Sequence, residues 1–146
     1  MKDRFKTFTI LIAKIARNIR RIKTEEMAEF KLKSPHVSCL YYLFKQKQMT
    51  AKELCDVCDE DKAAVSRSIE YLENNGLICC DSKMEKRYKS PLMLTKIGEK
   101  VAEQVVIKID NILSVASEGL SEENRVIFYQ SLELISNNLQ KICDKY

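Results

Sequence analysis

The sequence contains six cysteines, and two of them, Cys55 and Cys58, have a spacing that occurs in metal sites and in redox-active thiol pairs. A structural zinc site needs about four ligands. His36 and Cys39 share a face of the preceding helical segment and could supply the other two. Position 55, however, falls in a pattern of two short helices joined by a tight turn, where a small buried residue is required. A thiol or metal sensor therefore remains an alternative function, and we predict no bound metal or other cofactor.

Cys79 and Cys80 are adjacent in a strand-like run, so their side chains should point to opposite faces. That geometry suits neither a shared metal nor an unstrained disulfide. A sensing role stays open for these two residues and for Cys39. We find no secretory signal and no stretch of roughly 18 apolar residues that could span a membrane. We therefore expect a cytoplasmic protein with no membrane partner, whose thiols are reduced.

Catalytic machinery has no candidate in this sequence. We find no paired carboxylates, no nucleophile placed beside a general base, and no glycine-rich loop that could hold a phosphate. The whole chain has three glycines. We predict that the protein is not an enzyme.

The basic residues are unevenly distributed, although the net charge of +4 is too small to identify a polyanion partner. Residues 1–23 hold eight basic side chains against one acid, and residues 82–89 hold four against one. We interpret the N-terminal cluster as the solvated side of a helix. The second cluster lies between two strand-like runs and is a candidate for phosphate contacts.

A helical pattern between Asp61 and about Asn75 could present side chains to DNA. Its apolar stripe consists of Val65, Ile69 and Leu72. The other side carries Ala63, Arg67, Glu70 and Asn74, with Ser66 on the flank. Small residues at its start allow close approach to bases in a major groove roughly 12 Å wide. Arg67 could donate two hydrogen bonds to one guanine, and Lys62 and Ser66 suit phosphate oxygens.

The elements around this helix follow from caps and periodicity. Few breakers and many Leu, Ile, Lys and Glu residues favour long helices. N-caps are expected at Ser34, Thr50, Asp61 and Thr95, with Pro35 in a first turn and Glu53 completing a capping box. Helical patterns cover residues 5–22, 35–44, 50–57, 61–75, 97–116 and 121–142. Strand-like runs at 77–81 and 92–95 flank the second basic cluster and predict a hairpin. Val37, Leu40, Tyr41 and Phe44 are expected to face inward, and the short helix carries Leu54 and Val57. The helical pattern over 97–116 carries a further apolar stripe, formed by Ile97, Val101, Val105, Ile109, Ile112 and Ala116.

The first and last helical patterns carry apolar seams at alternating spacings of three and four residues, which is typical of helix-on-helix contacts. A chain of this size cannot cover both, and a second copy is the simplest partner. We expect a homodimer. The predicted dimerisation residues are Phe5, Phe8, Ile12, Ile15, Phe128, Leu132, Ile135, Leu139 and Ile142, with Ile19 and Ile22 continuing the first seam.

Three stretches resemble the central block of the MarR (multiple antibiotic resistance regulator) family of winged helix-turn-helix transcription regulators. They read TAKEL from Thr50, DKAAVSR from Asp61 and LENNGLI from Leu72. Leu94-Thr95 followed by Gly98 is similar to the Leu-Thr…Gly sequence that closes the family's wing and opens its long dimerisation helix. The likeness in element order extends over essentially the whole chain.

This resemblance implies one MarR-like domain over residues 1–146, mainly α with a small β-hairpin wing. Dimerisation helices would occupy 1–31 and 96–146, and the winged helix-turn-helix 34–95. It also implies a wing arginine that enters the minor groove. The wing sequence Glu85-Lys86-Arg87 departs in register from the family's Asp-x-Arg. We favour Arg87 for that role, with Lys86 and Lys89 as alternatives. Family members that sense organic peroxides use a first-helix cysteine, which this chain lacks.

We therefore expect a sequence-specific regulator, a repressor that binds double-stranded DNA as a homodimer and is released by an effector. Tyr41, Tyr42 and Phe44 form a candidate pocket for a small-molecule effector. A second alternative, besides the thiol or metal sensor, is a winged-helix module that binds proteins and has no DNA function.

Overall fold

The structure is a computed structural model that describes residues 3–58, 60–80 and 90–146. The chain divides into two compact units, residues 1–109 and 110–146, and each is described by itself. In the described part of the chain, no helix is long and apolar enough to cross a membrane.

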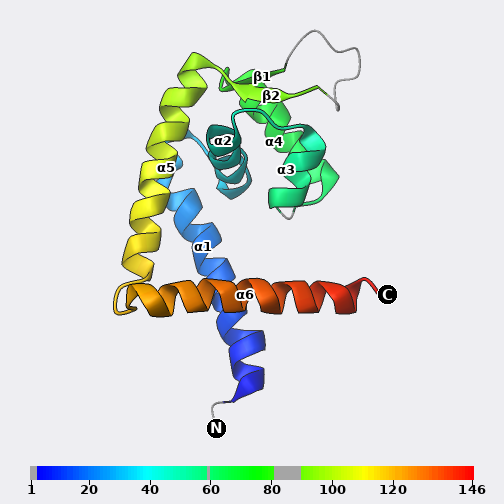
Figure 1. Ribbon diagram of the computed structural model, residues 1–146. Helices are drawn as coiled ribbons and strands as arrows, with labels where there is room; N and C mark the ends of the chain where they lie inside the picture. The colour runs from blue at the N-terminus through cyan, green and yellow to red at the C-terminus, as the bar shows by residue number, and fades with distance from the viewer. Residues whose placement is uncertain (1–2, 59, 81–89) are drawn as a thin grey trace. The chain divides into compact units, whose positions relative to one another are not determined.

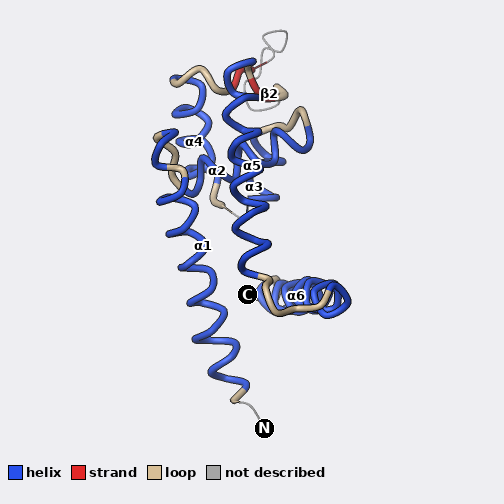
Figure 2. Tube along the Cα trace, turned by 90° about the vertical axis from the view of Figure 1, so that its left-hand side faces the viewer, coloured by secondary structure: helices blue, strands red, loops and turns tan. Residues whose placement is uncertain are grey.

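The first unit begins with a π-helical segment, η1 (Lys6–Leu11), that runs directly into helix α1 (Ile12–Glu26). Thr7 and Thr9 donate side-chain hydrogen bonds to the backbone carbonyl four residues earlier, at 3.1 and 2.6 Å. Such bonds compete with regular helical pairing. The apolar seam predicted for this helix was based on the α-helical repeat. The π-helical turns of η1 are wider, so the residues before Ile12 point in directions that differ from those the α-helical repeat gives. Figure 2 shows the N-terminal end of this helix projecting away from α2, α3 and α4.

A short 3-10 turn, η2 (Ala28–Phe30), leads into helix α2 (Ser34–Gln46). Pro35 lies in the first turn, as expected. The expected N-cap is wrong by one residue, because Ser34 is already helical and Lys33 precedes the helix. The backbone N–H of Lys33 donates to Nδ1 of His36 at 3.1 Å, which stabilises this end of the helix.

Helices α3 (Ala51–Cys58) and α4 (Lys62–Asn74) follow, and both begin at the predicted caps. The Thr50 N–H donates to Glu53 Oε2 at 3.0 Å, and the Glu53 N–H donates to Thr50 Oγ1 at 3.2 Å. This reciprocal pair is the expected capping box. Asp61 Oδ1 accepts the Ala64 N–H at 2.6 Å at the start of α4.

Strands β1 (Ile78–Cys80) and β2 (Leu92–Leu94) form the predicted antiparallel hairpin. Ile78 pairs with Leu94 and Cys80 with Leu92. Met49 adds an isolated bridge to Leu92, with N–H to carbonyl distances of 3.1 and 2.8 Å. The connector between α2 and α3 is therefore held against the hairpin (Figure 1).

Helix α5 (Lys96–Ala116) starts beside the end of α4, and Thr95 links the two. Its hydroxyl donates to the Gly76 carbonyl at 2.6 Å and accepts the Gly98 N–H at 2.9 Å. Gly98 is buried against the backbone of Leu77. The predicted cap at Thr95 therefore also links the end of α4 to the start of α5.

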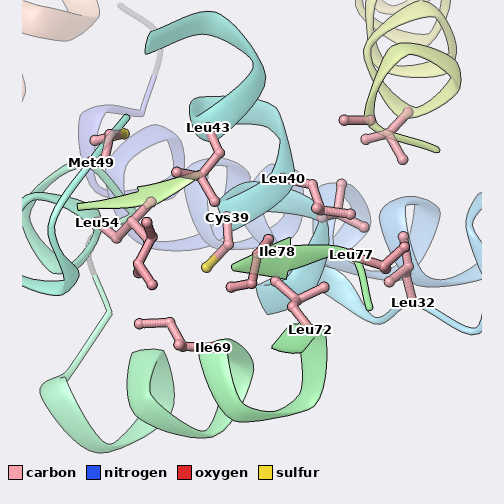
Figure 3. Close-up of a cluster of buried hydrophobic side chains, with 14 of the residues drawn as sticks. Leu32, Cys39, Leu40, Leu43, Met49, Leu54, Ile69, Leu72, Leu77 and Ile78 are labelled. Atoms are coloured by element: carbon pink, nitrogen blue, oxygen red, sulfur yellow. The ribbon is translucent and has the colours of Figure 1, made fainter. Parts of the chain in front are cut away.

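The core of the first unit is one apolar cluster drawn from α2, α3, α4, the hairpin and α5 (Figure 3). Its buried members are Met27, Leu32, Val37, Cys39, Leu40, Leu43, Met49, Leu54, Val65, Ile69, Leu72, Leu77, Ile78, Leu92, Ala102 and Val105. Tyr41 and Phe44 are only half-buried, and Leu43 takes the inward position on α2.

Three residues of the expected apolar stripes are exposed, namely Val57, Ile97 and Ala116. Val57 is 42% exposed, and Cys58 packs against the core instead. A helix of eight residues is too short for periodicity alone to fix its phase. Ile97 is 65% exposed, because the buried Gly98 places the first turn of α5 against the Leu77 backbone and turns position 97 outward.

The second unit contains the end of α5 and helix α6 (Glu122–Cys143). Ser121 Oγ accepts the Asn124 N–H at 3.2 Å, so α6 begins where the sequence predicted. No side chain of α6 is fully buried.

Candidate nucleic-acid interface

The two sides of α4 differ as the sequence predicted. Val65, Ser68, Ile69 and Leu72 are buried in the core. The outward side chains are Lys62, Ala63, Ser66, Arg67, Glu70 and Asn74, and all six are exposed. Arg67 lies in the first half of the helix, the part that meets base edges when such a helix enters a major groove. The structure thus brings four predicted DNA contacts, Lys62, Ala63, Ser66 and Arg67, onto one open face.

The N-terminus of α4 is held by Asp61, whose carboxylate accepts the Ala64 N–H. Ala63 is exposed and has no long side chain, so the first turn can approach a flat surface closely. The remaining N–H groups of a first turn carry partial positive charge and favour phosphate oxygens.

A hollow of about 390 Å³ lies beside Arg67 and was not predicted from the sequence. It is lined by Lys31, Lys33, Pro35, His36, Ala64, Arg67, Ser68 and Tyr71. Three of these residues carry positive charge, and they come from the loop before α2 and from α4. Basic side chains distant in the sequence therefore converge at the edge of the exposed α4 face.

An aromatic pair forms one wall of this hollow. The rings of His36 and Tyr71 stack with centroids 4.1 Å apart and planes 7° from parallel. The Tyr71 hydroxyl donates to the backbone carbonyl of Lys31, a residue in the left-handed region at φ 57°. These contacts join the loop before α2 to α4. No local pattern connects positions 36 and 71, so the sequence offered no signal for the pair.

His36 is more acidic here than a free histidine. Burial lowers its pKa, and the positive charge of Lys33 lowers it further. The hydrogen bond that Nδ1 accepts from the Lys33 N–H acts in the same direction, because the protonated ring could not accept it. The neutral ring is therefore the form that this packing stabilises.

The predicted wing contacts Lys86, Arg87 and Lys89 lie outside the described residues. The paired strand residues on either side of this segment are described, and they place residues 80 and 92 opposite each other. The DNA contacts of Lys86, Arg87 and Lys89 stay a prediction.

The predicted effector residues do not line the hollow. Tyr41, Tyr42 and Phe44 are half-buried on α2, and the rings of Tyr41 and Tyr42 meet edge to face at 5.5 Å. The Lys45 ammonium lies 5.5 Å from the Tyr41 ring and the Lys47 ammonium 5.0 Å from the Phe44 ring. A pocket at these rings stays a prediction.

The proposed metal ligands do not converge. His36 stacks on Tyr71, whereas Cys39 is buried in the core. Over residues 3–58, 60–80 and 90–146, no three His, Cys, Asp or Glu side chains are grouped so that they could hold a metal ion.

The predicted dimerisation residues form exposed apolar rows within each unit. Phe5, Phe8, Ile12 and Ile15 are all exposed in the first unit, as are Phe128, Leu132, Leu139 and Ile142 in the second, and Ile135 is half-buried. Monomeric proteins rarely leave such large contiguous apolar surfaces in water.

Comparison with known proteins agrees with this geometry. Residues 32–91 match the winged helix DNA-binding domain family. An uncharacterised HTH-type transcriptional regulator of Bacillus subtilis, YwoH, is 34% identical over 94 residues, which cover 64% of this chain and 68% of that protein.

Two solved structures share the fold. A MarR family regulator from Neisseria meningitidis, NMB1585, superposes with a TM-score of 0.83 over 98% of each chain, at 17% identity. A MarR family regulator from Listeria monocytogenes, solved in complex with a 26mer DNA, gives a TM-score of 0.83 over 95% of this chain and 90% of its own, at 24% identity. The mainly α fold with a β-hairpin wing is confirmed.

Proposed function

Because the chain belongs to the HTH-type transcriptional regulators and has the winged helix-turn-helix fold of the MarR family, we propose that it binds a pseudo-palindromic operator through α4. The observation that carries this proposal is the exposed face of α4, with Lys62, Ser66 and Arg67 outward and the opposite side fixed in the core. The family and the fold are those of DNA-binding regulators and not of enzymes.

Arg67 is the base-reading residue in this proposal. Its guanidinium can donate two hydrogen bonds to O6 and N7 of one guanine, and a good contact of this kind discriminates by about 1–3 kcal/mol. Lys62 and Ser66 bind phosphates on either side, and Ala63 allows the helix to approach. In the wing, we assign Arg87 to the adjacent minor groove, with Lys86 and Lys89 as the alternatives for this contact.

The hollow beside Arg67 extends this surface toward the loop before α2. Lys31 and Lys33 stand at its rim with exposed side chains. Because they are basic, exposed and beside Arg67, we assign them to phosphate contacts. These contacts add affinity without sequence preference.

The operator is bound by a homodimer, in which residues 1–31 and 96–146 supply the interface and 34–95 supply DNA contact. The exposed rows on η1, α1 and α6 support this division. A two-fold dimer presents one α4 to each half-site, with centres about one helical turn apart.

Such a dimer represses by occluding a promoter, in the cytoplasm where the DNA lies. A small-molecule effector that binds at Tyr41, Tyr42 and Phe44 would act close to Cys58 and the turn before α4. Release then follows if the effector favours a conformation in which the two α4 helices no longer match the groove spacing.

A mobility-shift titration on DNA from beside the protein's own coding region tests this function. Log affinity should fall linearly with log salt concentration, because bound phosphates release counterions. Lys62→Ala should weaken binding to all sequences and reduce that slope by roughly one unit for each phosphate that the variant no longer binds. Lys141→Ala, which removes an equal charge from α6, is the matched control and should leave the slope unchanged. A complex that forms independently of salt, or no complex at all, would favour the protein-interaction alternative.

A further inference from the structure

The loop before α2 carries two exposed lysines on either side of a buried leucine. Lys31 and Lys33 are exposed, whereas Leu32 between them is 2% exposed and belongs to the core cluster. The leucine therefore anchors the loop, and both lysines stay on its outside. They line the hollow beside Arg67, and none of the described residues that line it is acidic. The walls of the hollow thus offer no carboxylate to these three positive charges.

The backbone of Lys31 has a conformation that lysine seldom adopts. Its φ of 57° and ψ of 35° lie in the left-handed region, which glycine favours and in which a Cβ atom is crowded. Such a conformation persists only where neighbouring contacts hold it. On one side, the Lys31 N–H donates to the Ala28 carbonyl at 2.9 Å.

Tyr71 on α4 holds the other side of this residue. Its hydroxyl donates a hydrogen bond to the carbonyl of Lys31. The tyrosine ring is itself held by its parallel stack on His36. His36 Nδ1 in turn accepts the N–H of Lys33 at 3.1 Å. One aromatic pair therefore binds the backbone of both lysines, at the carbonyl of the first and at the N–H of the second.

Tyr71 also belongs to the helix that carries the base-reading residue. It follows Arg67 by four residues, about one turn of α4, and both side chains line the hollow. The Tyr71 hydroxyl thus joins α4 to a loop 40 residues earlier in the sequence. This single hydrogen bond places the backbone of Lys31 relative to the helix that carries Arg67.

We propose that Tyr71 is a positioning residue for DNA binding. Its hydroxyl fixes the backbone of Lys31, so that Lys31 meets a phosphate while Arg67 meets a base. This inference rests on the proposed function, because it assigns Tyr71 a role in that interface. Phosphate contacts set the register of a protein on the duplex. A lysine whose backbone is already held also loses less conformational entropy on binding.

Tyr71→Phe is the test variant, because it removes only the hydroxyl. The aromatic ring and its stack on His36 remain, so the wall of the hollow is kept. The Lys31 carbonyl loses its donor, and the loop should open more often. We expect operator binding to weaken about threefold, which is within the range for the loss of one hydrogen bond.

Proteolysis tests the structural premise without DNA. Native wild type and Tyr71→Phe are treated briefly with trypsin, and the cleavage sites are identified by mass spectrometry. Cleavage after Lys31 and Lys33 should be about threefold faster in the variant, because cleavage requires local opening of the loop. Cleavage after Lys141 on α6 is the internal control and should proceed at the same rate in both proteins. If cleavage after Lys31 is no faster in the variant, Tyr71 does not hold the loop and the proposal is overturned.

A double-mutant cycle separates positioning from a general effect on the fold. Lys31→Ala should weaken operator binding about tenfold and flatten the salt slope by about one unit. In that background Tyr71→Phe should have no further effect, because no ammonium remains to be positioned. Independent effects would instead multiply to about thirtyfold. In Lys31→Arg, which keeps a positive charge, the effect of Tyr71→Phe should persist.

Lys62→Ala is the matched control, because it removes an equal charge from a proposed phosphate contact in the first turn of α4. Its effect and that of Tyr71→Phe should multiply. If wild type binds no operator, the proposed function fails and the positioning role fails with it. If wild type binds, two results overturn the positioning role alone. In one, Tyr71→Phe leaves affinity unchanged, and in the other its effect multiplies with that of Lys31→Ala.

Discussion

A Cβ atom at position 98 would lie 1.8 Å from the carbonyl oxygen of Leu77. No side-chain adjustment can relieve that contact, because both atoms belong to the backbone or are fixed to it. The glycine is therefore what allows α5 to start directly beside the strand that follows α4, with Thr95 bonded to both sides.

Gly98→Ala should lower the free energy of unfolding by about 3 kcal/mol, since the helix and strand must separate to admit the methyl group. Urea denaturation at one fixed protein concentration measures this. Lys100→Ala, on the exposed side of the same helix, is the control and should change stability by less than about 0.5 kcal/mol. If both substitutions changed the free energy of unfolding equally, the close contact between position 98 and Leu77 would not require a glycine.

His36 offers a second residue-level test, because it is the only histidine in the chain. Its folded pKa lies below the ordinary value of 6.5. As the pH falls through 6.5, the unfolded chain therefore takes up a proton that the folded protein refuses, and stability decreases.

The free energy of unfolding should thus decrease between about pH 7.5 and about pH 5.5, the range where histidine titrates. His36→Gln, which keeps a hydrogen-bond acceptor for the Lys33 N–H, should flatten the profile in this range. Denaturant titrations of both proteins at several pH values measure the two profiles of unfolding free energy. Identical profiles for both proteins would contradict the packing described for His36 and Tyr71.

At the scale of elements, caps and strand pairing were the features that the sequence could predict. Thr50, Asp61 and Thr95 act on N–H groups within three residues, so a local pattern contains all the information. The hairpin was predictable for the same reason, because its two strands are close in the sequence and flank a single basic segment.

The phase of the short helix was not predictable in the same way. Val57 and Cys58 both suit an apolar face, and only packing against α2 selects Cys58. The contact of His36 with Tyr71 depends on how α2 meets α4. It joins residues 35 positions apart, which periodicity does not relate.

Asp61 connects the stability of α4 with DNA binding. Asp61→Ala removes the bond to the Ala64 N–H and should cost about 1 kcal/mol of stability. The first turn, which carries Lys62 and Ala63, should fray, so operator affinity should also decrease.

Asp61→Asn is the matched variant, because its amide oxygen can still accept the Ala64 N–H. It should recover most of the stability and bind DNA at least as well as wild type, since a negative charge near the phosphates is removed. Thermal melts and mobility shifts measure the two effects. If Asp61→Ala is as stable as Asp61→Asn, the cap contributes nothing.

For the whole molecule, the proposed dimer would cover the exposed apolar side chains of η1, α1 and α6. Ile135→Glu places a charge in the row on α6 and should convert dimers to monomers or insoluble protein. Asn137→Glu adds the same charge to another side of α6, and this control should remain dimeric. Sedimentation at micromolar concentration distinguishes the states. A stable monomeric wild type would refute the dimer directly.

The central claim is that two α4 helices read two half-sites, with Arg67 selecting a base in each. Selection from randomised DNA tests it, with wild type, Arg67→Ala and Arg67→Lys, which keeps the charge but loses the two-donor fork. Wild type should select a pseudo-palindrome with half-site centres about one helical turn apart. Both variants should lose preference at one base pair, symmetrically in each half-site, and keep the rest of the site. If Arg67→Ala selects the same operator with the same discrimination at every position, α4 does not read the DNA as proposed.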